Sequence, residues 1–114
     1  ARGQIIKNTN VFFENYDFLI APSSMVAPFS IKEHWPKKVE DKIFDNYVSW
    51  LMTAAAISLT GCPSLAVPCS TTKNNLPIGI QIIGKRRNEG QVLNLGHKFQ
   101  KHSNNYAITP FDPH

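Results

Sequence analysis

One segment of this 114-residue sequence has almost the spacing of a phosphate-binding loop. GIQIIGKR, from Gly79 to Arg86, matches G-x-x-x-x-G-K, but Arg86 stands where such loops carry the Ser or Thr that binds Mg²⁺. The isoleucines between the two glycines favour a β-strand, whose N–H groups bond within a sheet and are not available to a phosphate. We therefore interpret Gly79 and Gly84 as positions of close backbone approach inside a sheet.

A second segment, STTK from Ser70 to Lys73, has the Ser-x-x-Lys spacing of a serine nucleophile with a lysine base. That pairing needs a helix, because only there do the two side chains lie one turn apart on one face. The residues that follow, NNLP, are typical of a turn. We interpret the segment as an exposed connection without a nucleophile.

The other ionisable residues form no metal-binding or acid–base pattern. The histidines are His34, His97, His102 and His114. Their separations do not match H-x-x-x-H or H-E-x-x-H. Asp41 and Asp45 are helical neighbours, but lysines lie beside them, which is typical of a solvated face with ion pairs. The residues alone therefore predict no complete catalytic site, no metal and no cofactor.

Three apolar runs bounded by Pro or Gly are predicted to be strands of one sheet. They are Asp17–Ala21, Ser64–Cys69 and Ile78–Ile83. The last two are separated only by the polar loop Ser70–Pro77, so we expect them to lie side by side.

Apolar residues at helical spacing predict two helices before the second strand. The first covers Ile5 to Tyr16. The other begins near Glu40, becomes apolar on all sides after Tyr47, and ends at Gly61 as a C-cap. Because its second half has no polar face, we expect that half to be buried.

A third helix is predicted to begin at Asn88, which could form a capping box with Gln91. Its inward stripe is predicted to be Val92, Leu95, Gly96 and Phe99. Ser23–Lys38 has no sustained period and contains two prolines, so it is expected to be a loop. The tail after Ser103 is expected to be irregular.

Composition indicates one globular domain, residues 1–114, with 42% hydrophobic and 18% charged residues. The longest apolar run, Trp50–Leu59, is shorter than the roughly 18 to 20 residues that span a bilayer. We expect no membrane association, and the absence of a secretion signal favours a cytoplasmic protein. The chain opens with Ala1 and no initiator Met, so we expect an incomplete domain.

The net charge of +4 is spread along the chain without a basic stripe interleaved with aromatic residues. This pattern argues against a nucleic-acid partner. Cys62 and Cys69 flank a predicted strand, so they should lie about 23 Å apart and form no disulfide with each other. Two buried thiols fit a reducing compartment.

Four blocks occur in order along the chain: Asp17 with Pro22, Gly61-x-Pro63, Pro68, and LPIGIQIIG followed by Glu89. In this order the sequence resembles the C-terminal third of the amidase signature family, from about Arg2 to Lys101. The resemblance implies an α/β fold, here the C-terminal part of a mixed-sheet amidase signature fold with helices packed on the sheet.

The resemblance also implies hydrolysis of carboxylic amide C–N bonds through a Ser-cisSer-Lys triad. In the family that triad comes from a Gly- and Ser-rich core upstream, which this sequence lacks. We therefore expect no catalytic residue here and no activity from the chain alone. The implied partners are a small-molecule amide substrate and the remainder of the amidase fold.

By position in the family, five residues are carried over as substrate-binding. They are Trp50, Ala54, Ile57, Arg87 and Asn88. Plain core packing for the first three, and solvent exposure with helix capping for the other two, are the alternatives.

Two departures bear on the type of amidase. Ser58 stands where many members carry Asn, and Asn88 stands where glutamine-using amidotransferase subunits carry an Asp. Loss of that carboxylate favours a general amidase over the A subunit of an amidotransferase. A non-catalytic binding or interaction module with the same fold stays open, as do the amide substrate and the oligomeric state.

Overall fold

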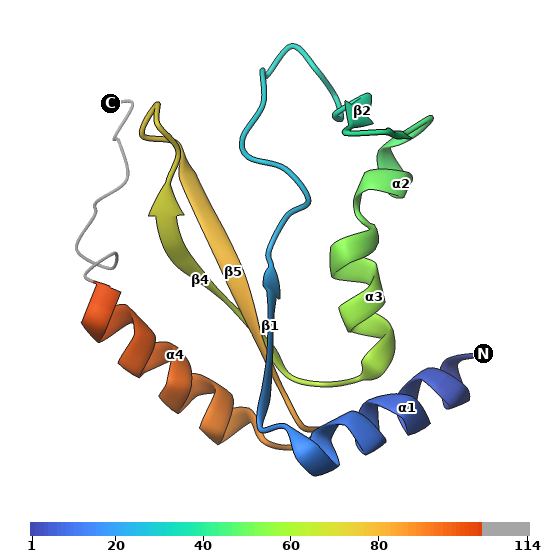
Figure 1. Ribbon diagram of the computed structural model, residues 1–114, viewed down its shortest axis with the longest axis vertical. Helices are drawn as coiled ribbons and strands as arrows, with labels where there is room; N and C mark the ends of the chain where they lie inside the picture. Colours follow the sequence, from blue (N-terminus) through green and yellow to red (C-terminus); the bar gives the residue numbers. More distant parts are fainter. Residues whose placement is uncertain (104–114) are drawn as a thin grey trace.

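The computed structural model describes residues 1–103. Its elements are α1 (Arg2–Asn15), β1 (Phe18–Pro22), β2 (Lys38–Val39), β3 (Lys42–Ile43), α2 (Tyr47–Trp50), α3 (Met52–Thr60), β4 (Ser64–Thr71), β5 (Pro77–Gly84) and α4 (Glu89–Ser103) (Figure 1). The tail expected to be irregular lies outside the described residues. The first helix, the three strands and the last helix are confirmed within one or two residues at most boundaries.

The three long strands form one antiparallel sheet in the order β1-β5-β4. In the register, Ile82 lies opposite both Ile20 and Leu65, which places these three side chains on one face. The predicted pairing of β4 with β5 is confirmed, with a register shift around Cys69. Helices on a sheet agree with the expected α/β class.

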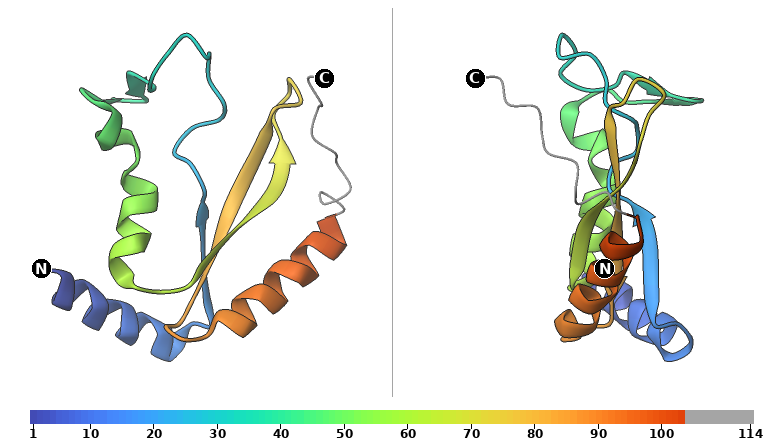
Figure 2. Two further views of the ribbon diagram at one scale, coloured as in Figure 1. Left: turned by 180° about the vertical axis from the view of Figure 1, so that it is seen from behind. Right: turned by 90° about the vertical axis from the view of Figure 1, so that its left-hand side faces the viewer.

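Helix α4 covers β4 and β5 on that face (Figures 1 and 2). Its predicted inward stripe is confirmed, because buried Val92 joins Val67 and Ile82 in the core while Leu95 and Phe99 pack against them. A Cβ atom on Gly96 would overlap the Leu65 side chain, so glycine lets the helix approach the sheet closely. This contact is the main hydrophobic core of the described chain.

Helices α1 and α3 pack together beside β1, on the side of the sheet away from α4 (Figure 1). Phe13 of α1 is buried, and the Arg2 side chain donates to the carbonyl of Leu59 at 3.4 Å. Gly61 ends α3 with φ 68°, which confirms the predicted C-cap.

The predicted start of the second helix is wrong. Instead of a helix from Glu40, the structure has the hairpin β2–β3, with Glu40 at φ 51° in its turn. Trp35 fixes this hairpin, because its indole N–H donates to the carbonyl of Phe44 at 3.0 Å. The helix begins only at Tyr47, where the Asn46 side chain accepts a bond from the backbone N–H of Ser49.

The predicted burial of the second half of this helix is also wrong within the described residues. Neither α2 nor α3 has a buried residue, and Val48, Met52 and Leu59 are 69%, 47% and 43% exposed. The two helices are separated at Leu51, where ψ is 2°. Most side chains of α2 and α3 are apolar, as the sequence indicates, but the described residues do not fully cover them.

Both outer strands of the sheet contain a proline, Pro22 in β1 and Pro68 in β4. Cys62 and Cys69 form no disulfide with each other, as expected, and both are half-buried instead of fully buried. Among residues 1–103, no helix has the length and apolar character needed to cross a membrane.

Candidate functional site

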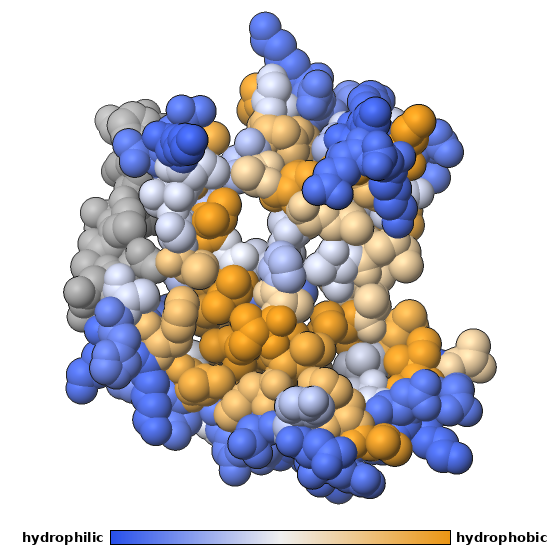
Figure 3. All heavy atoms as spheres, viewed as in Figure 1, coloured by the Kyte–Doolittle hydropathy of each residue, from blue (hydrophilic) through white to orange (hydrophobic). Residues whose placement is uncertain are grey.

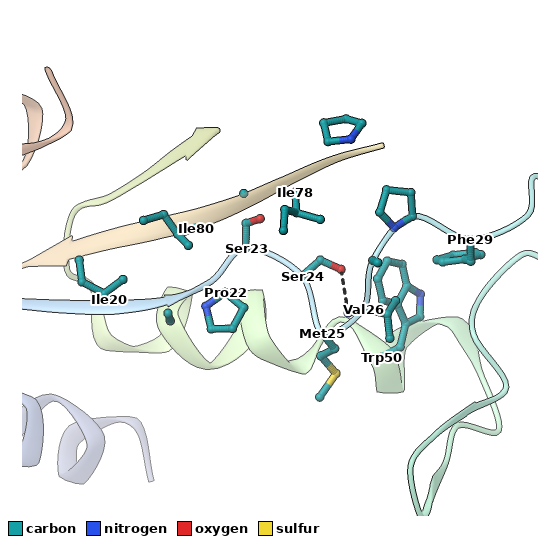
Figure 4. A pocket seen from close by; sticks show the side chains of 15 residues that line it. Ile20, Pro22, Ser23, Ser24, Met25, Val26, Phe29, Trp50, Ile78 and Ile80 are labelled. Atoms are coloured by element: carbon teal, nitrogen blue, oxygen red, sulfur yellow. Dashed lines mark hydrogen bonds between the residues drawn. The ribbon is translucent and has the colours of Figure 1, made fainter. Parts of the chain in front are cut away.

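A groove of about 690 Å³ opens where β1 ends (Figure 4). Its lining comes from three separate segments: residues 20–29 after and within β1, Trp50 of α2, and residues 77–80 at the start of β5. The space-filling view shows apolar residues gathered over the sheet below this region (Figure 3). The volume lies in the range typical of small-molecule sites.

The floor of the groove is built by hydrogen bonding between strands. The backbone N–H of Ser23 donates to the carbonyl of Gly79 at 3.2 Å, which continues the β1–β5 ladder past Pro22. A Cβ atom on Gly79 would lie 2.9 Å from the Ser23 hydroxyl oxygen. Glycine at this position therefore makes the space in which the Ser23 side chain lies.

One wall of the groove is aromatic. Trp50 and Phe29 meet edge to face, with ring centroids 5.7 Å apart, and Tyr47 contacts Trp50 in the same way at 5.9 Å. The Trp50 indole nitrogen is shielded from solvent and has no hydrogen-bond partner among the described residues. The ring therefore offers apolar surface to the groove, while its N–H stays covered.

Among residues 1–103, no charged side chain lines the groove. The polar side chains in the lining are Ser23 and Ser24, together with the indole of Trp50. The Ser24 hydroxyl accepts a long bond of 3.5 Å from the backbone N–H of Val26. Neither Lys nor His is among the described lining residues, so these supply no base that could activate either serine.

The five residues expected to bind substrate are only partly brought together. Trp50 lines the groove, and Ala54 lines a small adjoining hollow together with Ser23 and Ser24. Ile57 lies one turn further along α3, in a separate hollow against α1. Their contact with a substrate stays a prediction.

Arg87 and Asn88 lie in the turn between β5 and α4, whereas the groove is lined by residues 77–80 at the other end of β5. Figure 1 shows this turn. Arg87 has φ 65°, a left-handed conformation that is uncommon for a residue with a side chain. Asn88 meets Gln91 as expected, but through a side-chain bond from Nδ2 to Oε1 at 3.0 Å. Any role in substrate binding stays a prediction for this turn as well.

The groove residues Ser23, Ser24, Phe29 and Gly79 were missed by sequence reasoning. A sequence feature that could have indicated them is Pro22 followed by two serines, directly after a predicted strand. The segment from Ser23 was interpreted only as a loop. Which strand end faces which glycine depends on the sheet register, and one sequence does not give that register.

Both motifs that resembled catalytic sites are structural. Gly79 to Gly84 lie within β5, and Ser70 and Thr71 end β4. Lys73 lies in the following turn, where Thr72 accepts bonds from the backbone of Asn74 and Leu76. These results confirm the strand and turn interpretations. In residues 1–103, no cluster of three or more His, Cys, Asp or Glu side chains could hold a metal ion.

The model of the Amidase family matches residues 1–93. The A subunit of glutamyl-tRNA(Gln) amidotransferase from Brevibacillus brevis is 32% identical over 96% of this chain, and that from Bacillus cereus strain AH187 is 35% identical over 90%. The matches cover 21% and 20% of those proteins, so this chain spans about a fifth of the length of these curated relatives.

Solved structures give the same result. A bacterial aryl acylamidase of the amidase signature family superposes with a TM-score of 0.76 and 26% identity, over 90% of this chain and 21% of that one. The A subunit of the glutamyl-tRNA(Gln) amidotransferase from Thermotoga maritima superposes with a TM-score of 0.70 and 30% identity, again over 90% and 21%. The sheet, its three strands and the flanking helices therefore recur in much longer proteins.

Proposed function

This chain belongs to the amidase family, and from that premise we propose that it is the C-terminal segment of a hydrolase that cleaves carboxylic amide C–N bonds. In this proposal the Ser-cisSer-Lys triad lies upstream of Ala1. The chain supplies three sheet strands and one wall of the substrate site. The substrate is a small-molecule amide, and the other partner is the remainder of the amidase fold. We expect the enzyme to act in the cytoplasm.

The observation that carries the proposal is a substrate-sized groove whose lining contains serines without a base beside them. A Ser-Lys nucleophile needs a lysine deprotonated by burial and donors for the developing oxyanion. The groove provides shape and apolar surface but no such lysine, which fits a site completed by other residues. The match of this chain to about a fifth of its relatives agrees with that division.

The five carried-over residues have proposed roles that follow their positions. Trp50 forms the wall at the groove, Ala54 continues it in the adjoining hollow, and Ile57 follows along α3. Arg87 and Asn88 lie beyond the far end of the strand, so they would contact a different part of a substrate or of the completed enzyme.

The experiment is release of ammonia from simple aliphatic and aromatic amides. The purified 114-residue chain is expected to give none, whereas a polypeptide in which it is joined to an upstream segment with the Gly- and Ser-rich core should be active. Ser70→Ala and Lys73→Ala should leave the joined enzyme's activity unchanged. Turnover by the chain alone that is lost in either variant would overturn the proposal.

A second candidate function is that of a segment like the A subunit of an amidotransferase, and the names of the curated relatives favour it. Against it, Asn88 stands at the position where the family resemblance implies an Asp in the glutamine-using subunits. If the joined enzyme uses glutamine better than benzamide, and Asn88→Asp raises that preference, this candidate replaces the general amidase. A joined protein that binds amides without turnover would indicate the non-catalytic module.

A further inference from the structure

We propose that the groove selects uncharged amides with an apolar or aromatic body, and that the Ser23 hydroxyl is the group that recognises the amide. This inference rests on the proposed function and narrows its substrate class. The observations that support it are the uncharged lining, the placement of Ser23 and the aromatic wall.

The lining that this chain provides is unfavourable to charged ligands. A ligand with an ammonium and a carboxylate group, such as free glutamine, would lose hydration against this wall without gaining an opposite charge from it, because no Asp, Glu, Lys, Arg or His is among the described residues that line the groove. Burying an unpaired charge is far more costly than burying a neutral amide that keeps one hydrogen bond. This wall of the groove therefore favours neutral amides over amino-acid amides.

Ser23 is placed to make that one hydrogen bond. Its backbone N–H is already bound to the Gly79 carbonyl, which fixes the residue at the end of the ladder. Its side chain lies over Gly79 in space that a Cβ atom would fill, and it is half-buried. A hydroxyl can donate to an amide carbonyl or accept from an amide N–H, so either end of the group can be recognised.

The aromatic wall is expected to contact the apolar or aromatic part of the ligand. Phe29 and Trp50 hold each other edge to face, and isoleucines at positions 20, 78 and 80 add apolar surface from the two strands (Figure 4). Because the Trp50 nitrogen is covered, the ring contributes contact area and no competing donor. An aryl group packed here would gain stacking in addition to burial.

The test is equilibrium binding followed by NMR shifts of the chain's backbone amides, with benzamide, toluene and glutamine as probes. A circular dichroism spectrum checks folding, and if the chain alone is aggregated the same titrations use the joined polypeptide. Benzamide should move the amide signals of residues 20–29 and 77–80 in a saturable way. Toluene should bind the same residues more weakly, and glutamine should leave them unshifted.

Ser23→Ala should weaken benzamide binding by about two- to tenfold, the worth of one neutral hydrogen bond, while toluene binding changes less than about twofold. Ser70→Ala, an exposed serine outside the groove, is the matched control and should change neither. Ser23→Thr keeps the hydroxyl and should retain more affinity than Ser23→Ala.

Several outcomes overturn the inference. Binding of glutamine at these residues as tightly as benzamide would show that the groove does not select uncharged amides. Equal effects of Ser23→Ala and Ser70→Ala would show that the Ser23 hydroxyl does not recognise the amide. If neither benzamide nor toluene shifts these amide signals, the groove does not bind such ligands. Ammonia release by the joined enzyme is a separate measurement that also uses aliphatic amides, so failure of this inference is distinguishable from failure of the proposed function.

Discussion

At the scale of single residues, both the sheet and the groove depend on the absence of a Cβ atom at Gly79. A Cβ atom there would lie 2.9 Å from the Ser23 hydroxyl oxygen and 3.1 Å from the Val67 carbonyl oxygen. The first neighbour is a side chain that could rotate, but the second is backbone of the paired strand β4 and has little freedom to move. Overpacking of this kind distorts the sheet beneath the groove.

We predict that Gly79→Ala lowers the free energy of unfolding by about 1–3 kcal/mol. Gly90→Ala is the matched control, because open space surrounds Gly90 within α4 and alanine favours a helix by roughly 0.5–1 kcal/mol. Thermal unfolding followed by circular dichroism should move in opposite directions for the two variants. A Gly79→Ala protein that is as stable as the parent would contradict the described packing.

Gln81 is a buried polar residue that joins all three strands. Its side chain is 7% exposed, accepts from the Ser64 hydroxyl at 3.0 Å, and donates to the Pro22 carbonyl at 3.0 Å. It therefore ties the middle strand to both neighbours, including the residue just before Ser23. Glutamine is mostly exposed in proteins, so the sequence alone does not predict that Gln81 is buried and bonded in this way.

Gln81→Leu should lower the free energy of unfolding by about 1–2 kcal/mol, because both partners lose a hydrogen bond. Gln4→Leu offers the comparison, since Gln4 is exposed and its side chain donates to Asn8 one turn away; its effect should stay within about 0.5 kcal/mol. Urea unfolding of the two variants measures the difference. Equal midpoints would show that the Gln81 bonds add nothing to stability.

At the scale of elements, the end of α3 is set by Gly61 in a left-handed conformation, φ 68°. Gly61→Ala should destabilise the chain by about 1 kcal/mol, and Gly61→Asn by less, because asparagine tolerates this conformation. The thermal midpoint is the readout, and Gly3→Ala in α1 is the control, because nothing surrounds Gly3 closely. Equal midpoints for Gly61→Ala and the parent would be evidence against this cap.

The elements that could be predicted from sequence are those whose signals are local. The stripe of α4, the Pro- and Gly-bounded strands and the Gly61 cap all follow from spacing along the chain. The β2–β3 hairpin could not be predicted, because Val39, Ile43 and Tyr47 repeat at helical spacing although the segment is tied by a bond from Trp35. Tertiary contacts there override local periodicity.

The candidate site was predicted less well than the fold. Trp50 was found through the family resemblance, but the other groove residues come from the end of β1, the loop after it and the start of β5. Their meeting depends on the pairing of Pro22 with Ile80 and on the bond from Ser23 to Gly79. Neither is encoded in a local pattern, so the groove could be recognised only in three dimensions.

At the scale of the whole molecule, the chain is more open than a compact domain. Its radius of gyration is 16.1 Å, compared with about 13 Å expected for a compact domain of this length. Its accessible surface is 8741 Å², compared with roughly 6,300 Å² for a compact monomer. The exposed side chains of α2 and α3 account for part of this excess.

We predict that the purified chain self-associates through these helices. Size-exclusion chromatography with light scattering should show oligomers, and Val48→Glu with Met52→Glu should reduce them by adding charge to the exposed apolar surface. Ile31→Glu is the control, because Ile31 is fully exposed in a loop and should have no effect. A monodisperse parent chain that melts cooperatively would instead favour the stand-alone binding module.

The prolines in the two outer strands limit the form that this self-association takes. Growth of an amyloid-type fibril requires each added strand to find an uninterrupted row of N–H and C=O groups, and a proline within the row removes a donor. Pro22 interrupts one edge of the sheet, and on the other edge Pro68 is followed by the register shift at Cys69. Oligomers of the isolated chain should therefore be amorphous and should not bind thioflavin T.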